Sequence, residues 1–145
     1  MPALAGVLAI AAVSGTATVP PTELVKSLFA SQAIELTKRG YVCVQVNGVD
    51  PAVEQMKALS AAGPHVVTGS ACTKVMDTDK GSFHTATKEP AYFFNVHDFT
   101  GNLAEHGDVK ISIYHHGLWA IYKTLEVRKL NGAWVVVRVK EHAEA

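Results

Sequence analysis

The stretch TLEVRKLNGAWVVVRVK, residues 124–140, decides the fold because it contains two runs typical of β-strands around a turn signal. The signal is Asn131-Gly132, which favours a two-residue hairpin turn. Such a turn would pair Arg128 with Val135 and mix charged with apolar residues. A three-residue loop that ends at the glycine would instead pair Val127 with Val135 and give one almost wholly apolar face. Because a one-residue shift exchanges the two faces of a strand, we predict the three-residue loop.

The stretch SIYHHGLWA, residues 112–120, is predicted to form a second corner of the same sheet. Apolar and polar residues alternate before it, as they do in a half-buried strand. A three-residue loop, His115–Gly117, would pair Ile113 with Trp119 on the apolar face. Gly117 would then have a positive φ, and both histidines of the loop would be largely exposed.

Two helices are predicted ahead of these strands. Apolar residues recur at helical spacing over Glu23–Arg39, after a candidate N-cap at Thr22. A shorter helix follows Asp50 as its predicted N-cap. Further strand candidates are residues 41–46, 65–67, 71–76 and 91–98. The sequence therefore predicts an α+β domain, in which an N-terminal amphipathic helix and a short second helix pack on a curved antiparallel sheet with a C-terminal β-meander.

The composition limits the classes of partner. The 145 residues are 48% hydrophobic and 18% charged, which suits one domain with its own core. Thirteen basic residues balance thirteen acidic ones, and the sequence pI is about 7.1. Because the formal net charge is zero, we expect neither nucleic acid nor an anionic membrane surface as a partner. An unknown small ligand or protein partner is expected instead.

The N-terminus has the features of an export signal. Residues 2–13, PALAGVLAIAAV, are continuously apolar, too short to span a bilayer, and typical of the central part of a signal peptide. Gly15-Thr16-Ala17 is an acceptable cleavage site, although no Lys or Arg precedes the apolar run. A buried N-terminal helix or strand is the alternative. We predict a signal peptide or its remnant at 1–18, a single domain at 19–145 without a membrane span, and export to the periplasm or medium.

Cys43 and Cys72 are the two cysteines of the chain. In an exported protein we expect a disulfide between them, which would close a loop of roughly 30 residues. In a reducing compartment both would be buried thiols.

The histidines do not match a known catalytic or metal motif. The chain has seven, none in a zinc-binding pattern, and we expect no cofactor. Metal binding by His115 and His116 with a third ligand is one alternative. A small enzyme with His97, Asp98 or Tyr92 in an apolar pocket is another, although neighbouring side chains on a strand point to opposite faces.

The less apolar face of the predicted sheet is the preferred candidate for binding, because aromatic and arginine side chains are common at interfaces. Its candidate ligand-binding residues are Tyr114, Tyr122, Arg128, Trp134 and Arg138. Arg128 and Trp134 are expected to lie opposite each other as a cation–π pair. If the first half of the chain covers this face, the same residues would only be packing groups. The expected function is therefore a non-enzymatic binding or accessory protein.

Several stretches resemble a group of small uncharacterised exported bacterial proteins. They are CVQVNGVDP at 43–51, GSAC at 69–72, YHHGLWA at 114–120 and LEVRKLNGAWVVVR at 125–138. That resemblance implies no established activity. The last hairpin is also similar to the final strands of NTF2-like and cystatin-like folds, which implies a helix packed in a curved antiparallel sheet. Such a fold permits a pocket without naming its ligand.

Overall fold

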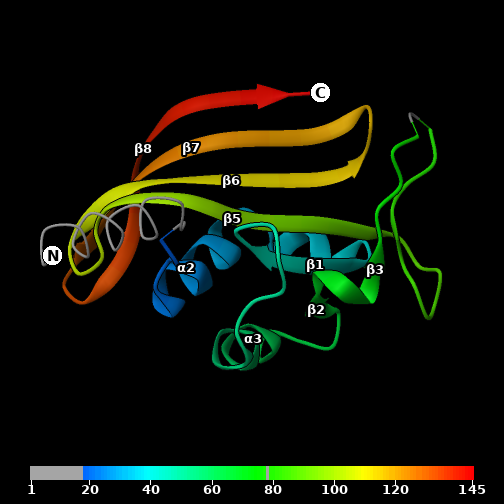
Figure 1. Cartoon of the computed structure of the whole chain (residues 1–145), viewed down its shortest axis with the longest axis horizontal. Helices are drawn as coiled ribbons and strands as arrows, with labels where there is room; N and C mark the ends of the chain where they lie inside the picture. Colours follow the sequence, from blue (N-terminus) through cyan, green and yellow to red (C-terminus); the bar gives the residue numbers. More distant parts are fainter. Residues whose placement is uncertain (1–17, 78) are drawn as a thin grey trace, which may run out of the picture.

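A computed structural model describes residues 18–77 and 79–145, so almost all of the predicted leader lies outside the described residues. Figure 1 shows the helices gathered beside one long sheet. The helical elements are α2 (Thr22–Gln32), η1 (Ile34–Lys38), α3 (Val53–Ser60) and η2 (Gly69–Ala71). The strands are β1 (Tyr41–Val46), β2 (Val66–Thr68), β3 (Cys72–Thr73), β4 (Phe83–His84), β5 (Ala91–Asn102), β6 (His106–His116), β7 (Trp119–Leu130) and β8 (Ala133–Glu144).

Six of the strands form one sheet in the order β2-β1-β5-β6-β7-β8, and β3 and β4 form a separate pair. Strand β1 runs parallel to both of its neighbours, and the meander β5–β8 is antiparallel throughout. The hairpin end of β7 and β8 bends towards α2 (Figure 1). The predicted α+β class, with two helices on a mostly antiparallel sheet, is therefore confirmed.

The main core lies between the helices and one face of the sheet. Leu24, Val25, Leu28 and Phe29 of α2 are all buried there. The ring of Phe29 meets that of Phe94 from β5 edge-on, with 6.1 Å between the ring centres. Burying a side chain of this size stabilises the folded state by about 1.5–3 kcal/mol. The buried face of α2 therefore holds the helix firmly on the sheet.

The ends of the helices differ from the prediction. Helix α2 stops at Gln32, because Ala33 leaves the helical region at φ −134°, and a 3₁₀ turn continues the chain. The cap position is held by Pro21 and not by Thr22. Helix α3 starts after Ala52, so Asp50 is not its cap. The Asp50 carboxylate instead accepts hydrogen bonds from the backbone N–H and the hydroxyl of Ser70.

The β7–β8 hairpin has the two-residue turn, so the prediction of a three-residue loop is wrong. Leu130 pairs with Ala133, and Asn131 and Gly132 have φ of 53° and 81°. Arg128 therefore does lie opposite Val135. Further from the turn, β8 contains two bulges. The extra residues are Val137 and Lys140, and each shifts the pairing of β8 with β7 by one residue. The two-residue turn already places Val136 opposite Val127, and the first bulge then brings Val139 opposite Leu125.

The histidine corner also differs from its prediction. His116 pairs with Trp119 across a two-residue turn, and Ile113 pairs with Ile121 instead of Trp119. His115 is an extra, bulged residue between the pairs on either side of it. Among the described glycines, those with positive φ are Gly48, Gly63, Gly101 and Gly132. Gly117 is not one of them, because a bulge again sets the register.

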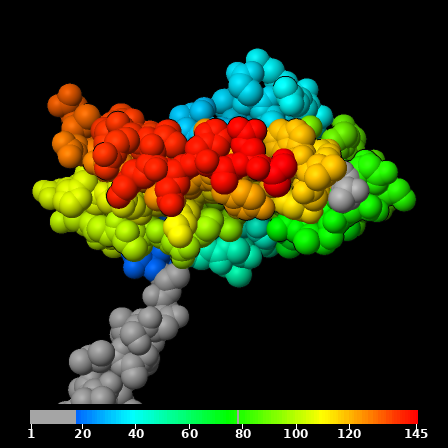
Figure 2. Space-filling view, turned by 90° about the horizontal axis from the view of Figure 1, so that it is seen from above, coloured from blue at the N-terminus to red at the C-terminus, as the bar shows by residue number. Residues whose placement is uncertain are grey.

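Strand β8 forms one edge of the sheet. Figure 2 shows it in red along the front of the molecule, with no other described segment lying over it in this view. Its outer half is exposed and rich in charge, with Arg138, Lys140, Glu141 and Glu144. The two bulges lie in the same strand. Charges and bulges are the usual protection of an exposed sheet edge.

Candidate functional site

The sheet face opposite the helices, called the open face below, is partly covered by one segment of the chain. This strap comprises residues 72–77 and 79–90, and the Cys43–Cys72 disulfide ties its start to β1. The predicted disulfide is thus present. Further along the strap, the hydroxyl of Tyr114 donates to the carbonyl of Val75 at 2.7 Å. The Lys74 ammonium lies over the rings of Phe93 and Tyr114, at 5.2 and 4.9 Å from their centres. The strap therefore closes one end of the open face.

A groove of about 540 Å³ lies on the part of the open face that the strap leaves free. Its lining residues are His97, Lys110, Ile111, Tyr122, Lys123, Thr124, Glu141, His142 and Ala143. They come from β5, β6, β7 and β8, which are neighbours in the sheet. Tyr122 is its exposed aromatic residue, with 46% of its surface accessible. The groove therefore combines one exposed aromatic ring with polar and charged side chains and with the aliphatic residues Ile111 and Ala143.

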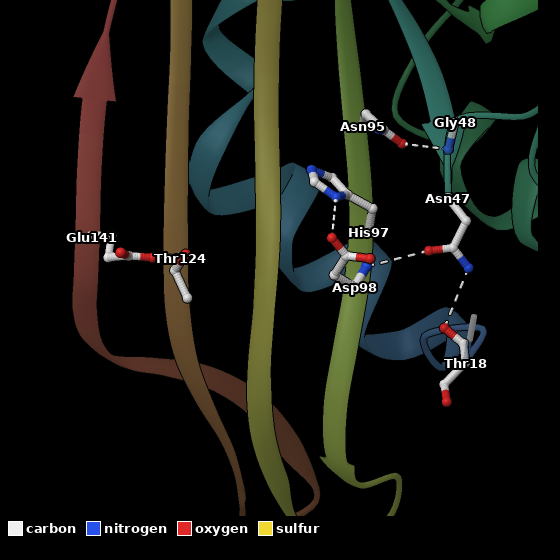
Figure 3. Close-up of polar contacts among 8 residues, drawn as sticks. All are labelled: Thr18, Asn47, Gly48, Asn95, His97, Asp98, Thr124 and Glu141. Atoms are coloured by element: carbon white, nitrogen blue, oxygen red, sulfur yellow. Dashed lines mark hydrogen bonds and ion pairs between the residues drawn. The ribbon is translucent and has the colours of Figure 1, made fainter. Parts of the chain in front are cut away.

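His97 and Asp98 form a hydrogen-bonded pair at the β5 side of the groove. His97 Nδ1 donates to Asp98 Oδ2 at 3.1 Å (Figure 3). The prediction that these neighbours diverge is wrong, because Asp98 is part of a bulge and has a left-handed φ of 53°. The carboxylate only accepts, so the Nδ1 of His97 carries the proton of this hydrogen bond.

Asn47 holds the bulged Asp98 in place. Its side-chain oxygen accepts from the backbone N–H of Asp98 at 3.3 Å, and its amide nitrogen donates to the carbonyl of Thr18 at 3.3 Å (Figure 3). Asn47 itself has a left-handed φ of 52°. Asn and Asp are the non-glycine residues that adopt this region most readily, so the turn at Asn47 and the bulge at Asp98 are held together by one hydrogen bond without an unusual backbone.

Most charges on the open face are already paired. Lys140 contacts Asp108 at 2.6 Å, and Arg138 contacts Glu126 at 3.1 Å. Lys110 is exposed and, within 18–77 and 79–145, has no ion-pair partner. It lies between its sheet neighbours His97 and Thr124.

Thr124 and Glu141 complete the polar wall of the groove. The Thr124 hydroxyl donates to Glu141 Oε1 at 2.8 Å, and the two side chains lie on neighbouring strands in Figure 3. Thr124 pairs with Glu141 in the sheet because the bulge at Lys140 shifts β8 by one residue. The groove thus offers a cation at Lys110 and acceptor atoms at Thr124 and Glu141.

The predicted binding residues do not all lie together. Tyr122 is in the groove, Tyr114 is under the strap, and Arg138 is paired with Glu126. Arg128 is exposed near the hairpin end of β7, opposite Val135. These positions spread the predicted set along the whole open face.

Trp134 lies on the opposite face from the other four, in the main core. It is only 4% exposed and packs edge-on against Phe99, with 6.3 Å between ring centres. Its backbone carbonyl accepts from the Ser27 hydroxyl of α2 at 2.7 Å. The expected cation–π pair with Arg128 is wrong, because the two-residue turn places Trp134 opposite Lys129.

His115 and His116 are half-buried, not largely exposed. His115 Nδ1 donates to the Ala91 carbonyl at 2.8 Å, and its ring stacks on Tyr92 at 4.5 Å. Tyr92 is therefore part of this aromatic contact and not of the His97 site. In the described part of the chain, no group of three metal-ligating side chains is close enough to hold an ion.

Sequence reasoning missed Lys110, Thr124, Glu141 and Asn47. Alternation along β6 and β7 already put the first two on the face of Tyr122. The position of Glu141 depends on a bulge, and that of Asn47 on a contact between residues far apart in sequence. No local signal marks either one.

No protein-family model matches this chain, and neither a curated protein nor a solved structure is significantly similar to it. Among the described helices, none is both long and apolar enough to cross a bilayer. The chemistry of the groove is therefore the basis for assigning a function.

Proposed function

We propose that this protein is a non-enzymatic binding protein that holds a small ligand in the groove of the open face. The observation that carries the proposal is the exposed ring of Tyr122 in a groove that is lined by polar and charged side chains together with Ile111 and Ala143. An exposed aromatic ring offers a flat apolar surface, and its hydroxyl adds a hydrogen-bonding group. Ligand sites commonly combine one such anchor with a few polar groups that fix orientation.

The surrounding side chains define the chemistry of this ligand. Lys110 donates hydrogen bonds, and Glu141 accepts them. Both signs of charge are present, so a strongly anionic or strongly cationic ligand would meet one like charge. A ligand with one apolar face and several neutral hydrogen-bonding groups fits these partners best.

The test is ligand-observed NMR with small probes that share these features, such as glucose, benzyl alcohol and benzamide. At least one probe should receive saturation from the protein, and Tyr122→Ala should remove that transfer. Leu103→Ala is the matched control, because Leu103 is an exposed apolar side chain in the β5–β6 turn, outside the lining of the groove. Equal transfer to the wild type and Tyr122→Ala would contradict the proposal.

We also propose that the protein is exported. The Cys43–Cys72 disulfide and the leader-like sequence at 2–13 support this location. Expression of the full chain in a bacterial host should give a periplasmic or secreted product with a new N-terminus near Thr18. N-terminal sequencing and thiol alkylation measure both properties. A full-length product with two free thiols would contradict export. The resemblance to small exported bacterial proteins, and to NTF2-like and cystatin-like folds, stays a prediction.

The His97–Asp98 pair supports a second candidate function, proton transfer to or from a ligand in the groove. A carboxylate that orients a histidine ring is the arrangement of a general base, although this groove is open to solvent. Hydrolysis of 4-nitrophenyl acetate tests it. An enzyme should lose most of its rate in His97→Asn and part of it in Asp98→Asn. Equal rates in all three proteins would leave binding as the only function of the groove.

A further inference from the structure

We infer that the open face binds a neutral oligosaccharide, which lies across the strands from the groove at Tyr122 to a second groove beside the disulfide. This inference rests on the proposed binding function and names its ligand class. It follows from three features: a row of uncharged side chains, a groove at each end of that row, and two amide side chains in the row whose orientation is fixed by hydrogen bonds.

The row crosses five strands in exact sheet register. Gln45 of β1 pairs with Asn95 of β5, and Asn95 pairs with Ser112 of β6. Ser112 pairs with Tyr122 of β7, and Tyr122 pairs with Ala143 of β8. Paired residues on neighbouring strands lie on the same face, so these five side chains form one line on the open face. The line contains amide, hydroxyl and aromatic groups and no charge.

The second groove lies at the Gln45 end of the row and has a volume of about 490 Å³. Its lining residues are Gln45, Gly48, Val49, Asp50, Gly69, Ser70, Cys72, Lys74 and Phe93. The first groove lies at the other end and includes Tyr122 and Ala143. Strands are roughly 4.8 Å apart, so the four steps of the row span about 19 Å. A single small molecule does not fill that length, whereas a chain of several sugar rings does.

The two amides of the row are fixed by the β1 turn. Asn95 Oδ1 accepts from the backbone N–H of Gly48 at 3.0 Å (Figure 3), and Gln45 Nε2 donates to the Gly48 carbonyl at 3.4 Å. Each amide is thereby held by one end and presents its other end, Asn95 Nδ2 or Gln45 Oε1. Both side chains are half-buried, so little rotamer freedom is left to lose on binding. A donor and an acceptor side by side match the hydroxyl groups of sugars.

Other classes of extended ligand fit this row less well. A peptide strand bound by β-addition would use the edge of the sheet, and not a line that crosses the strands. A nucleic acid needs a strongly basic surface, whereas Arg138 and Lys140 of this face are already paired with Glu126 and Asp108. A lipid chain needs a continuous apolar groove. A neutral polyol, with an apolar ring face for Tyr122, matches the row without any of these conflicts.

The test is calorimetric titration with neutral hexasaccharides of glucose, N-acetylglucosamine, mannose and xylose, each compared with its disaccharide. At least one hexasaccharide should bind, with a Kd at least tenfold lower than that of its disaccharide. Asn95→Ala and Gln45→Ala should each raise the hexasaccharide Kd several-fold and leave the disaccharide Kd unchanged. Tyr122→Ala should abolish the binding of both the hexasaccharide and the disaccharide. Ser112→Tyr, which adds bulk in the middle of the row, should block only the longer sugar, and thermal unfolding checks that each variant folds.

The outcomes separate this inference from the proposed function. If the small probes bind through Tyr122 but no hexasaccharide does, the oligosaccharide is excluded and the binding function remains. Equal affinity for hexasaccharide and disaccharide would confine the ligand to the first groove and overturn the row. If hexapeptides bind in a Tyr122-dependent way and no hexasaccharide does, the inference of an oligosaccharide ligand is also overturned. If neither probes nor sugars bind, both the inference and the proposed function fail.

Discussion

The two corners of the β6–β7–β8 meander look alike in sequence and differ in what holds them. At the Asn131-Gly132 corner, both turn residues have positive φ and the tip is exposed. The histidine corner has no such pair, and it is tied to the strap instead. Gly117 N–H donates to the Asp77 carbonyl at 2.7 Å, and Ser82 N–H donates to the His115 carbonyl at 2.7 Å. One corner is thus fixed by its own turn residues and the other by tertiary contacts.

Trp134→Ala should give the largest loss of stability, about 3–5 kcal/mol, because it empties a core position beside Phe99. Urea unfolding measures this loss. Val137→Ala, at an exposed position of the same strand, is the control and should cost much less. If the Trp134 variant loses under 1 kcal/mol, Trp134 is not a core residue and the described hairpin register is wrong.

Replacing both cysteines by alanine should cost about 3–4 kcal/mol, because the bridge closes a loop with a sequence separation of 29. The strap would then be held less firmly, so amide hydrogen exchange should rise at the histidine corner and not at the Asn131-Gly132 corner. Reductant should destabilise the wild type and leave the variant unchanged. A uniform rise in exchange at both corners would contradict the difference described above.

His115→Ala should cost about 1–3 kcal/mol, because it leaves the Ala91 carbonyl without its partner and removes the stack on Tyr92. His106→Ala is the matched control at an exposed position and should change stability by less than about 0.5 kcal/mol. Thermal unfolding of the two variants measures both changes in stability. Equal effects would mean that His115 is a surface residue.

Gly132→Ala should have the smallest effect, about 1 kcal/mol, because φ is 81° and no other atom lies within 4 Å of an added Cβ. The loss is then purely conformational, so Gly132→Asn should recover part of it, since Asn tolerates this region. Chemical denaturation of both variants measures the difference. If Gly132→Asn loses as much stability as Gly132→Ala, the loss has a cause other than the positive φ of residue 132.

The fold class, the first strand and the disulfide were predictable, because each depends on local pattern or on a count. Val42, Val44 and Val46 alternate in the sequence and are buried in β1. Pairing register was not predictable, because bulges change it without a sequence signature. Both three-residue loops were inferred from the assumption of regular strands, and each strand pair contains a bulge that breaks it.

The candidate site was predicted only in part, for the same physical reason. Tyr122 was placed on the correct face by alternation, whereas Trp134 was placed on the wrong one by the shifted register. The His97–Asp98 contact depends on the left-handed Asp98, which Asn47 supports from a distant turn. Alternation predicts which face a residue occupies, and irregularities in the strand decide which residues meet.

The irregular outer strand also has a consequence for the behaviour of the protein in concentrated solution. A regular edge strand presents evenly spaced N–H and C=O groups on which another chain can grow. The extra residues at Val137 and Lys140 interrupt that spacing within β8, and Arg138, Lys140 and Glu141 add the cost of desolvating charge. The same two bulges that bring Glu141 to the groove thus make this edge a poor template for fibre growth.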